Sequence, residues 1–153
     1  VKTHFPNTRF VLVGPTDTSP DGIPFDEVAN WVADGVIDYK GSALDVRPFI
    51  EAAHVYVLAS YHEGLPRSSI EAMAMGRSVI TTVVPGCRET VVEGVNGFLI
   101  PVADAESLAK KMIWFIKHPE QMRQMGLASR KIAEERFDVH TVNARMVEIM
   151  KIK

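Results

Sequence analysis

The chain has 153 residues, which fits one domain of ordinary size and is too short for two large ones. Apolar residues make up 46% and charged residues 24% of the chain, a balance that excludes intrinsic disorder as its main state. Lys and Arg number 17 against 19 Asp and Glu, so the formal net charge is −2. This charge argues against a basic protein that coats nucleic acid, and we expect no nucleic-acid partner.

The single cysteine, Cys87, excludes an intramolecular disulfide and a Cys-rich zinc site, and it suits a reducing cytosol. No apolar run approaches the length of a membrane span. The first residues, Val1–Phe5, do not form a signal peptide. They also lack an initiator Met, so we expect the chain to be a piece of a longer protein.

Short apolar runs and helical stretches alternate along the chain. The sequence predicts five strands, in chain order Arg9–Val13, Val36–Tyr39, Val55–Ala59, Ser78–Thr82 and Gly97–Ile100. Between and after them it predicts helices over Phe25–Asp34, which follows a Pro20-Asp21-Gly22 turn, and over Asp45–Ala53, Ser68–Met75 and Ala103–Lys117. Two or three further helices are predicted to the end of the chain, interrupted at Pro119 and Gly126.

This alternation predicts an α/β fold of Rossmann-like type, with a mostly parallel sheet covered by helices on both faces. The predicted strands are apolar without strict alternation, as is typical of strands buried on both faces. Ligands of such sheets bind at the carboxyl ends of the strands. The candidate binding loops therefore follow Val13, Tyr39, Ala59 and Thr82.

The loop after the third predicted strand carries the most chemical information. Ser60–Gly76 contains the end of a strand, a Gly-Leu-Pro turn and a helix that we expect to begin at Ser68 or Ser69. A helix N-terminus exposes free backbone amides and the positive end of the helix dipole, so it can hold a phosphate. Gly64 allows a ligand to approach the backbone closely.

Two glutamates flank this turn. Glu71 lies about one turn into the predicted helix, where its carboxylate can accept hydrogen bonds from two vicinal hydroxyls, as on a ribose. Glu63 precedes the turn and can face a second hydroxyl-bearing group. One helix end would then contact hydroxyl, phosphate and hydroxyl groups in series. A helix cap at Ser68 and a solvated surface charge at Arg67 are the simpler interpretations of those two residues.

The whole stretch closely resembles the nucleotide-sugar-binding C-terminal domain of GT-B glycosyltransferases, the large retaining group called glycosyltransferase family 4. Glu63 and Glu71 match the two glutamates that this family separates by seven residues. The resemblance covers nearly the whole chain. The other matching segments are Phe10–Pro15, Val36–Gly41, Asp45–Leu58, Ser78–Thr82 with Pro85–Glu89, and Asn96–Ile100 with the helix from Ala103.

The resemblance implies a role for each matching residue. Glu71 would hold the ribose hydroxyls of the donor, and Glu63, the candidate catalytic residue, would contact the hydroxyls of the transferred sugar. Pro66 has no N–H and cannot donate a hydrogen bond. The sugar and diphosphate would meet Gly64, Leu65, Pro66, Arg67, Ser68 and Ser69. The base, most often uracil in this family, would lie beside Tyr39, Lys40 and Gly41, with Gly14 in the neighbouring glycine turn.

The implied activity is transfer of a sugar from a nucleotide-diphospho-sugar, UDP-linked, with retention of configuration. The acceptor would be a glycan or lipid-linked molecule in bacterial polysaccharide or capsule assembly. Such enzymes need no Asp-x-Asp metal motif, and none occurs in the sequence, so we expect neither a metal nor a cofactor. Hydrogen-bond donors and cations would neutralise the leaving group instead. The enzyme would work in the cytoplasm, at the inner face of the membrane.

Two parts of the family's pattern are missing from the chain. A first strand, whose loop bears Arg and Lys that clamp the diphosphate, would precede Val1, and so would the N-terminal acceptor-binding domain. We therefore predict that residues 1–153 are the donor-binding domain of a longer two-domain enzyme, which binds donor weakly on its own and does not catalyse transfer. A sheet that lacks a strand has unpaired edges, which favours a homodimer or strand exchange.

Three other functions stay open. One is a GT-B epimerase or phosphorylase, which the context of the paired glutamates fits less well. Another is a non-catalytic nucleotide-sensing or scaffold domain on a decayed GT-B fold, which would be indifferent to Glu71→Ala. A dinucleotide oxidoreductase fits worst, because no Gly-x-Gly-x-x-Gly follows the first strand.

Several further residues are expected to be structural rather than functional. The expected roles are an exposed side chain for His62, a packed thiol for Cys87, the opening of a short helix for Glu89, and core packing for Met73, Met75 and Met112.

Overall fold

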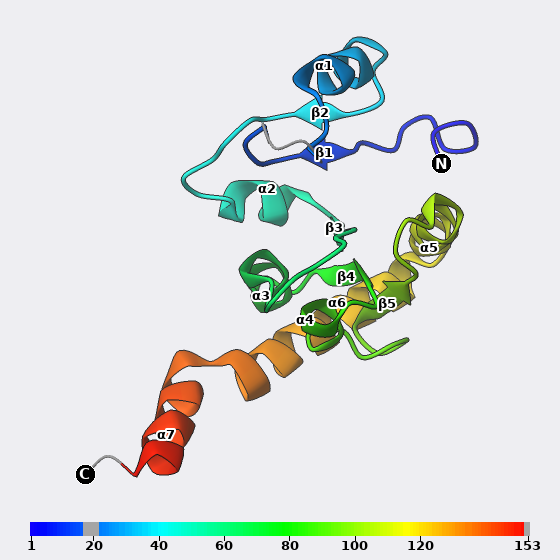
Figure 1. Ribbon diagram of the computed structural model, residues 1–153. Helices are drawn as coiled ribbons and strands as arrows, with labels where there is room; N and C mark the ends of the chain where they lie inside the picture. Colours follow the sequence, from blue (N-terminus) through cyan, green and yellow to red (C-terminus); the bar gives the residue numbers. More distant parts are fainter. Residues whose placement is uncertain (17–21, 152–153) are drawn as a thin grey trace. The chain divides into compact units, whose positions relative to one another are not determined.

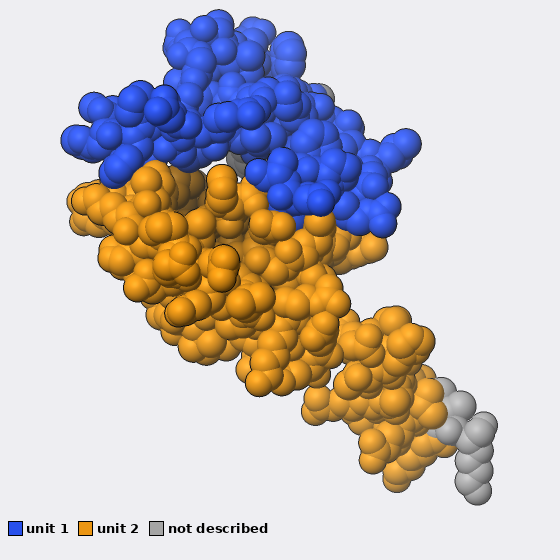
Figure 2. Space-filling view, turned by 180° about the vertical axis from the view of Figure 1, so that it is seen from behind, with its two compact units in different colours: residues 1–52 blue, residues 53–153 orange. Residues whose placement is uncertain are grey.

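The computed structural model describes residues 1–16 and 22–151. The chain divides into two compact units, residues 1–52 and residues 53–153 (Figure 2). In each unit strands and helices alternate, and each strand pair of the described chain is parallel. The predicted α/β, Rossmann-like fold class is therefore confirmed. Most of the predicted Pro20-Asp21-Gly22 turn lies outside the described residues.

The first unit contains a two-stranded parallel sheet and two helices (Figure 1). Strand β1 (Val11–Leu12) pairs with β2 (Asp38–Tyr39), and helix α1 (Phe25–Ala33) connects them. Helix α2 (Arg47–Ala52) ends the unit. All four elements were predicted from the sequence, and all four are shorter than predicted.

Strand β1 corrects one expectation. Its apolar residues were predicted to be buried on both faces of a sheet, but Val11 and Leu12 are 45% and 41% exposed. Among the described residues β1 pairs with β2 alone, so it is an edge strand. An edge strand of a two-stranded sheet has too few neighbours to cover both of its faces.

The second unit is built on a three-stranded parallel sheet in the order β3-β4-β5. These strands are Val55–Leu58, Ser78–Thr82 and Gly97–Ile100. The central strand β4 is buried at all five positions, whereas β3 is half-buried throughout. The expectation of strands buried on both faces therefore holds for β4, which has a strand on each side.

The core of this unit lies on both faces of the sheet. Val79 and Ile80 are consecutive in β4, so their side chains point to opposite faces. Val79 packs with Met73, Val91, Ile132 and Ala133, which brings α3 and α6 to one face. Ile80 packs with the residues of the other face, namely Phe98, Ile100, Phe115 and Met125.

In the described part of the second unit, four helices pack against this sheet and a fifth, the last, packs on the helix before it. They are α3 (Arg67–Ala74), α4 (Pro85–Arg88), α5 (Ala105–Lys117), α6 (Pro119–Phe137) and α7 (Val139–Met150). The sequence predicted two or three helices after Pro119, and the described residues form two, α6 and α7, whereas α4 was not predicted. No helix in the described part of the chain is long and apolar enough to cross a lipid bilayer.

Two predictions about helix boundaries were wrong. Gly126 lies inside α6 rather than interrupting the chain, because the helix packs there on the turn after α3. A Cβ atom at Gly126 would lie only 2.3 Å from the carbonyl oxygen of Gly76. Glu89 does not open a helix but follows the end of α4. Pro119 occupies the first turn of α6, a position that suits its missing N–H.

The residues expected to be structural mostly are. Met73 and Cys87 are completely buried, and Met112 packs against the cluster around Phe98. Met75 is only half-buried, because it caps the C-terminus of α3. His62 is exposed, as expected.

Candidate functional site

The loop Ser60–Pro66 connects β3 to α3 at the carboxyl end of β3. The side of the loop that faces β4 and α4 is tightly held. The hydroxyl of Thr82, at the end of β4, donates a hydrogen bond of 2.6 Å to the carbonyl of Ser60. Gly86, in the first turn of α4, lies directly against the backbone of Glu63 and Gly64.

Helix α3 begins at Arg67, with Pro66 as N-cap, so neither serine caps the helix as the sequence suggested. Ser68 instead accepts a hydrogen bond of 2.7 Å from the phenol of Tyr56 on β3. Burial raises the pKa of this phenol, and the hydrogen bond with Ser68 partly offsets the rise. Tyr56 therefore ties the first turn of α3 to the sheet as a protonated donor.

Ser69 offers less to a ligand than the residues before it. Its side chain is completely buried, and its amide donates to the carbonyl of Pro66 at 3.1 Å. The side chain of Arg67, in contrast, is exposed.

A run of free backbone donors lies along the loop and the helix start. Among the described residues, the amides of Glu63, Gly64, Leu65, Arg67 and Ser68 have no acceptor. Gly64 and Leu65 are exposed, and a Cβ at Gly64 would meet no atom within 4 Å. Free amides that converge at a helix N-terminus form a site that favours anionic oxygen atoms.

The two glutamates lie on either side of this run of amides. Glu63 is in the loop and Glu71 is in the second turn of α3, and both are half-buried. Neither carboxylate has a hydrogen-bond or ion-pair partner among the described residues. Each can therefore accept hydrogen bonds from a ligand without first giving up a partner.

The remaining predicted residues lie in the first unit and are described separately. The phenol of Tyr39 donates a hydrogen bond of 2.9 Å to the carbonyl of Gly14. The amide of Gly14 donates in turn to the carbonyl of Gly41, also at 2.9 Å. The turns after β1 and β2 are therefore joined, as the carboxyl ends of neighbouring parallel strands should be. Gly14 and Gly41 both have positive φ, of 150° and 67°, which glycine adopts without strain.

Lys40 is held by an acidic partner. Its ammonium group lies 2.7 Å from the carboxylate of Asp38, which also pairs with Arg9 at 3.2 Å. The hydrogen bond from Lys40 is the main reason that the pKa of Asp38 is lowered, with Arg9 contributing. Both partners of Asp38 are largely exposed, so these pairs add little stability.

No metal centre or thiol site emerges in the described part of the chain. No group of three or more His, Cys, Asp or Glu side chains is placed to hold a metal ion across residues 1–16 and 22–151. Cys87 is completely buried against the core and is not accessible as a nucleophile.

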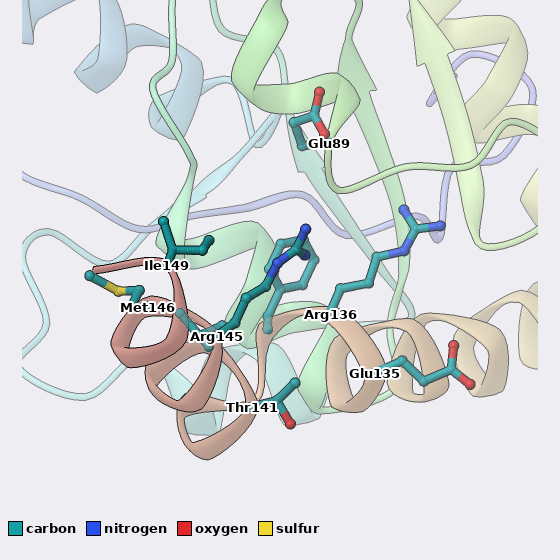
Figure 3. A pocket seen from close by; sticks show the side chains of 9 residues that line it. Glu89, Glu135, Arg136, Thr141, Arg145, Met146 and Ile149 are labelled. Atoms are coloured by element: carbon teal, nitrogen blue, oxygen red, sulfur yellow. The ribbon is translucent and has the colours of Figure 1, made fainter. Parts of the chain in front are cut away.

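The second unit also contains an open cavity of about 490 Å³ (Figure 3). Its walls are the end of α6, most of α7 and Glu89, and Arg136 and Arg145 project there together with Met146 and Ile149. None of the predicted donor-site residues lines this cavity. It is a feature of the α6–α7 region and not of the loop after β3.

The chain resembles one known family over most of its length. The family described as glycosyl transferases group 1 matches residues 1–118, about three quarters of the chain. The chain belongs to this family. The match covers both groups of predicted site residues, from Gly14 to Glu71. The resemblance of its motifs to this family is therefore confirmed.

Two curated relatives take part in glycan assembly according to their names. The Vi polysaccharide biosynthesis protein VipC/TviE of Salmonella typhi is 35% identical over 108 residues, which cover 69% of this chain and 18% of that protein. The N,N'-diacetylbacillosaminyl-diphospho-undecaprenol alpha-1,3-N-acetylgalactosaminyltransferase of Campylobacter jejuni is 29% identical over 142 residues. They cover 92% of this chain and 36% of that enzyme.

HepE of Anabaena is a similar solved structure. In complex with UDP it matches with a TM-score of 0.86 and 26% identity, over 95% of this chain and 41% of the HepE chain. HepE has also been solved with UDP-glucose, with a TM-score of 0.84. The group 1 chain has the fold of one half of a GT-B enzyme. It spans well under half the length of these relatives.

Sequence reasoning missed three residues that shape the loop of this group 1 domain. Thr82 and Gly86 contact the backbone of the loop, and Tyr56 donates a hydrogen bond to Ser68 in the first turn of α3. The hydroxyl at the end of a buried strand and the Pro-Gly pair after it were visible signals. Their partners were not, because those contacts join segments that are distant in sequence.

Proposed function

We propose that this chain is the donor-binding domain of a glycosyltransferase that uses a nucleotide-diphospho-sugar, with UDP as the nucleotide. The observation that carries the proposal is a run of backbone amides between Glu63 and Glu71, in which neither the amides nor the two carboxylates have a partner within residues 1–16 and 22–151. A nucleotide-diphospho-sugar carries ribose hydroxyls, then the diphosphate, then the hydroxyls of the sugar. Glu71, the amides and Glu63 would meet these groups in the same order. Membership of the glycosyl transferases group 1 family supports this reading of the geometry.

Each part of the site has a role in this proposal. Glu71 binds the ribose hydroxyls, and Glu63 binds hydroxyls of the transferred sugar close to the reacting carbon. The amides from Gly64 to Ser68, Pro66 excepted, donate to the sugar and the diphosphate. The turns that Tyr39 joins, at Gly14 and Gly41, flank the uracil base.

In the chemical step the bond between the anomeric carbon of the sugar and an oxygen of the diphosphate breaks, a hydroxyl oxygen of the acceptor bonds to that carbon, and the hydroxyl's proton passes to the released UDP. Negative charge then grows on the departing UDP. Preoriented amides at the start of α3 and the exposed guanidinium of Arg67 stabilise that charge without a metal ion. Lys40 is paired with Asp38, and its place beside the base is what the family resemblance implies.

Three finer assignments belong to the same proposal. The transfer proceeds with retention, the acceptor is a glycan or a lipid-linked glycan, and the reaction takes place at the cytoplasmic face of a membrane. The acceptor is bound by residues outside this chain, since the chain spans 36% of the Campylobacter jejuni relative, whose name includes a diphospho-undecaprenol substrate. We accordingly expect residues 1–153 alone to bind donor and not to transfer sugar.

The test is a thermal-shift panel of UDP, GDP, ADP and NAD on the 153-residue chain. A ligand that binds only the folded state raises the melting temperature by mass action. We expect a rise with UDP that is larger than with the other nucleotides. A concentration one hundred times the Kd corresponds to about 2.7 kcal/mol of added stability.

Glu71→Ala should abolish most of the UDP-dependent rise, because the carboxylate that binds the ribose is removed. Glu120→Ala is the matched control, since Glu120 is an exposed glutamate in the first turn of α6. An equal shift in both variants would contradict the role of Glu71 and would favour a scaffold domain. Sugar transfer by the 153-residue chain itself would contradict the expectation that the acceptor side lies outside it.

A further inference from the structure

We propose that Gly86 and Thr82 are positioning residues that fix the loop Ser60–Pro66 in the conformation that binds the donor. The expected effect on UDP binding rests on the proposed function. The contacts of Gly86 and Thr82 with the loop do not depend on it. Both residues come from the β4–α4 segment, whose loop the sequence predicted as a candidate binding loop without assigning a role to Gly86 or to the Thr82 hydroxyl.

Gly86 sets the position of the loop by close contact. A Cβ atom at Gly86 would lie 1.9 Å from the carbonyl oxygen of Gly64 and 2.5 Å from that of Glu63. Contacts under 3.0 Å are essentially never made by a real Cβ, and the opposing atoms are backbone rather than flexible side chain. The backbone of the loop can therefore sit where it does only because residue 86 has no side chain.

Thr82 fixes the beginning of the same loop. Its side chain is 1% exposed, and its hydroxyl donates 2.6 Å to the carbonyl of Ser60. One residue earlier, the buried hydroxyl of Thr81 donates 2.9 Å to the carbonyl of Leu58, at the end of β3. The end of β4 and the start of α4 thus hold the end of β3 at Leu58 and the loop at Ser60 and at Glu63–Gly64.

The opposite side of the loop is open. A Cβ at Gly64 would meet nothing within 4 Å, and Tyr61 and Leu65 are 74% and 48% exposed. The loop therefore has one side packed against α4 and one side free for a ligand. Rigidity comes from the packed side, and the amides of Glu63, Gly64 and Leu65 are held in place without meeting acceptors of their own.

A displaced loop should bind the donor more weakly, because a hydrogen bond tolerates only a small change in the distance between donor and acceptor. A methyl group at residue 86 would have to move about 1.5 Å away from the Gly64 carbonyl oxygen, from 1.9 Å to 3.4 Å, to reach an ordinary contact distance, and the Glu63–Gly64 backbone would be displaced accordingly. Hydrogen bonds between amides and oxygens lose most of their energy over such a displacement, and the donor needs several at once.

The experiment is a UDP titration of the 153-residue chain followed by amide NMR. Gly86→Ala should shift the amide signals of Glu63 to Leu65 and weaken UDP binding at least tenfold. The matched control is Gly126→Ala, because its Cβ would also press on a backbone carbonyl, that of Gly76 at 2.3 Å, beyond the other end of α3. The control should lower stability while leaving UDP affinity within about twofold.

Thr82 provides a second test that does not depend on a steric clash. Thr82→Val keeps the shape of the side chain and leaves the carbonyl of Ser60 without its donor, whereas Thr82→Ser keeps the hydroxyl. We expect Thr82→Val to weaken UDP binding severalfold and Thr82→Ser to restore most of the affinity. A purely structural role of Thr82 would lower the melting temperature of Thr82→Val and leave its UDP affinity unchanged.

Two results would overturn the inference. One is a folded Gly86→Ala chain with unmoved loop amides or with wild-type UDP affinity. The other is a Gly126→Ala chain that loses UDP binding as much as Gly86→Ala, since the effect would then be general destabilisation. A wild-type chain that binds no UDP would instead contradict the proposed function, and the amide shifts would still decide whether Gly86 anchors the loop.

Discussion

Asn96 is a buried polar residue whose whole side chain is used to fix the turn before β5. It is completely buried, and its amide oxygen accepts 2.7 Å from the amide of Val92 while its amide nitrogen donates 3.0 Å to the carbonyl of Thr90. Its own carbonyl accepts from the hydroxyl of Ser129 in α6. The side chain of Asn96 therefore fixes the loop after α4, and its backbone carbonyl links that loop to the long helix.

Asn96→Ala should destabilise the chain by about 2–3 kcal/mol, because two buried backbone groups would lose their partners. Equilibrium unfolding in urea measures the change. Asn143→Ala, on the exposed face of α7, is the control and should stay within about 0.5 kcal/mol of wild type. A loss at Asn96 no greater than at Asn143 would mean that water replaces the lost partners.

At the scale of single elements, α5 is the clearest case of local encoding. Asp104 is its N-cap, and the carboxylate accepts 2.8 Å from the amide and 2.6 Å from the hydroxyl of Ser107. The helix also begins with Glu106 and ends with Lys117, which both suit the helix dipole. The sequence predicted this helix to within two residues because the signals at its start and end are local.

The cap makes α5 sensitive to acid. Hydrogen bonds from the side chain and then the backbone of Ser107 lower the pKa of Asp104 below its usual value of 3.8. A carboxyl whose pKa is lower in the folded state contributes stability above about pH 4 and loses it as the pH falls through the folded-state pKa. The difference in melting temperature between wild type and Asp104→Asn should therefore shrink from about pH 6 to about pH 3. A constant difference would show that the charge of the cap is not what stabilises α5.

At the scale of the whole molecule, the two units differ in the size of their cores. Among the described residues, Val28 and Ile50 are the buried apolar side chains of the first unit, and the second unit holds all the others. A unit of about 50 residues with so small a core is marginal on its own. We therefore expect the first unit to open more readily than the second.

Amide hydrogen exchange on the intact chain measures this difference. Amides of β1, α1 and β2 should exchange at least tenfold faster than those of β4 and β5, whose strands lie in the larger core. UDP should slow exchange in the loop after β3 if the donor binds there. Equal protection in both units would mean that the first unit gains its stability from the second.

The loop after β3 shows how far the sequence leads toward the candidate site. The pattern of strand, turn, helix and paired glutamates is local, so Glu63, Glu71 and the free amides between them were found from residue types and spacing alone. Their roles stay predictions until the UDP experiments are made. The start of α3 was misplaced by one or two residues, because Pro66 rather than a serine occupies the N-cap.

The sequence by itself determined which segments become strands and helices and which family the motifs resemble, since periodicity, capping and turn residues act over a few neighbouring positions. Only the tertiary structure decided that Val11 and Leu12 are exposed, that Gly126 lies inside a helix, and that Gly86 and Thr82 contact the loop Ser60–Pro66. Those outcomes depend on contacts between segments that are distant in the chain. Close packing at these contacts limits which side chain fits at each position.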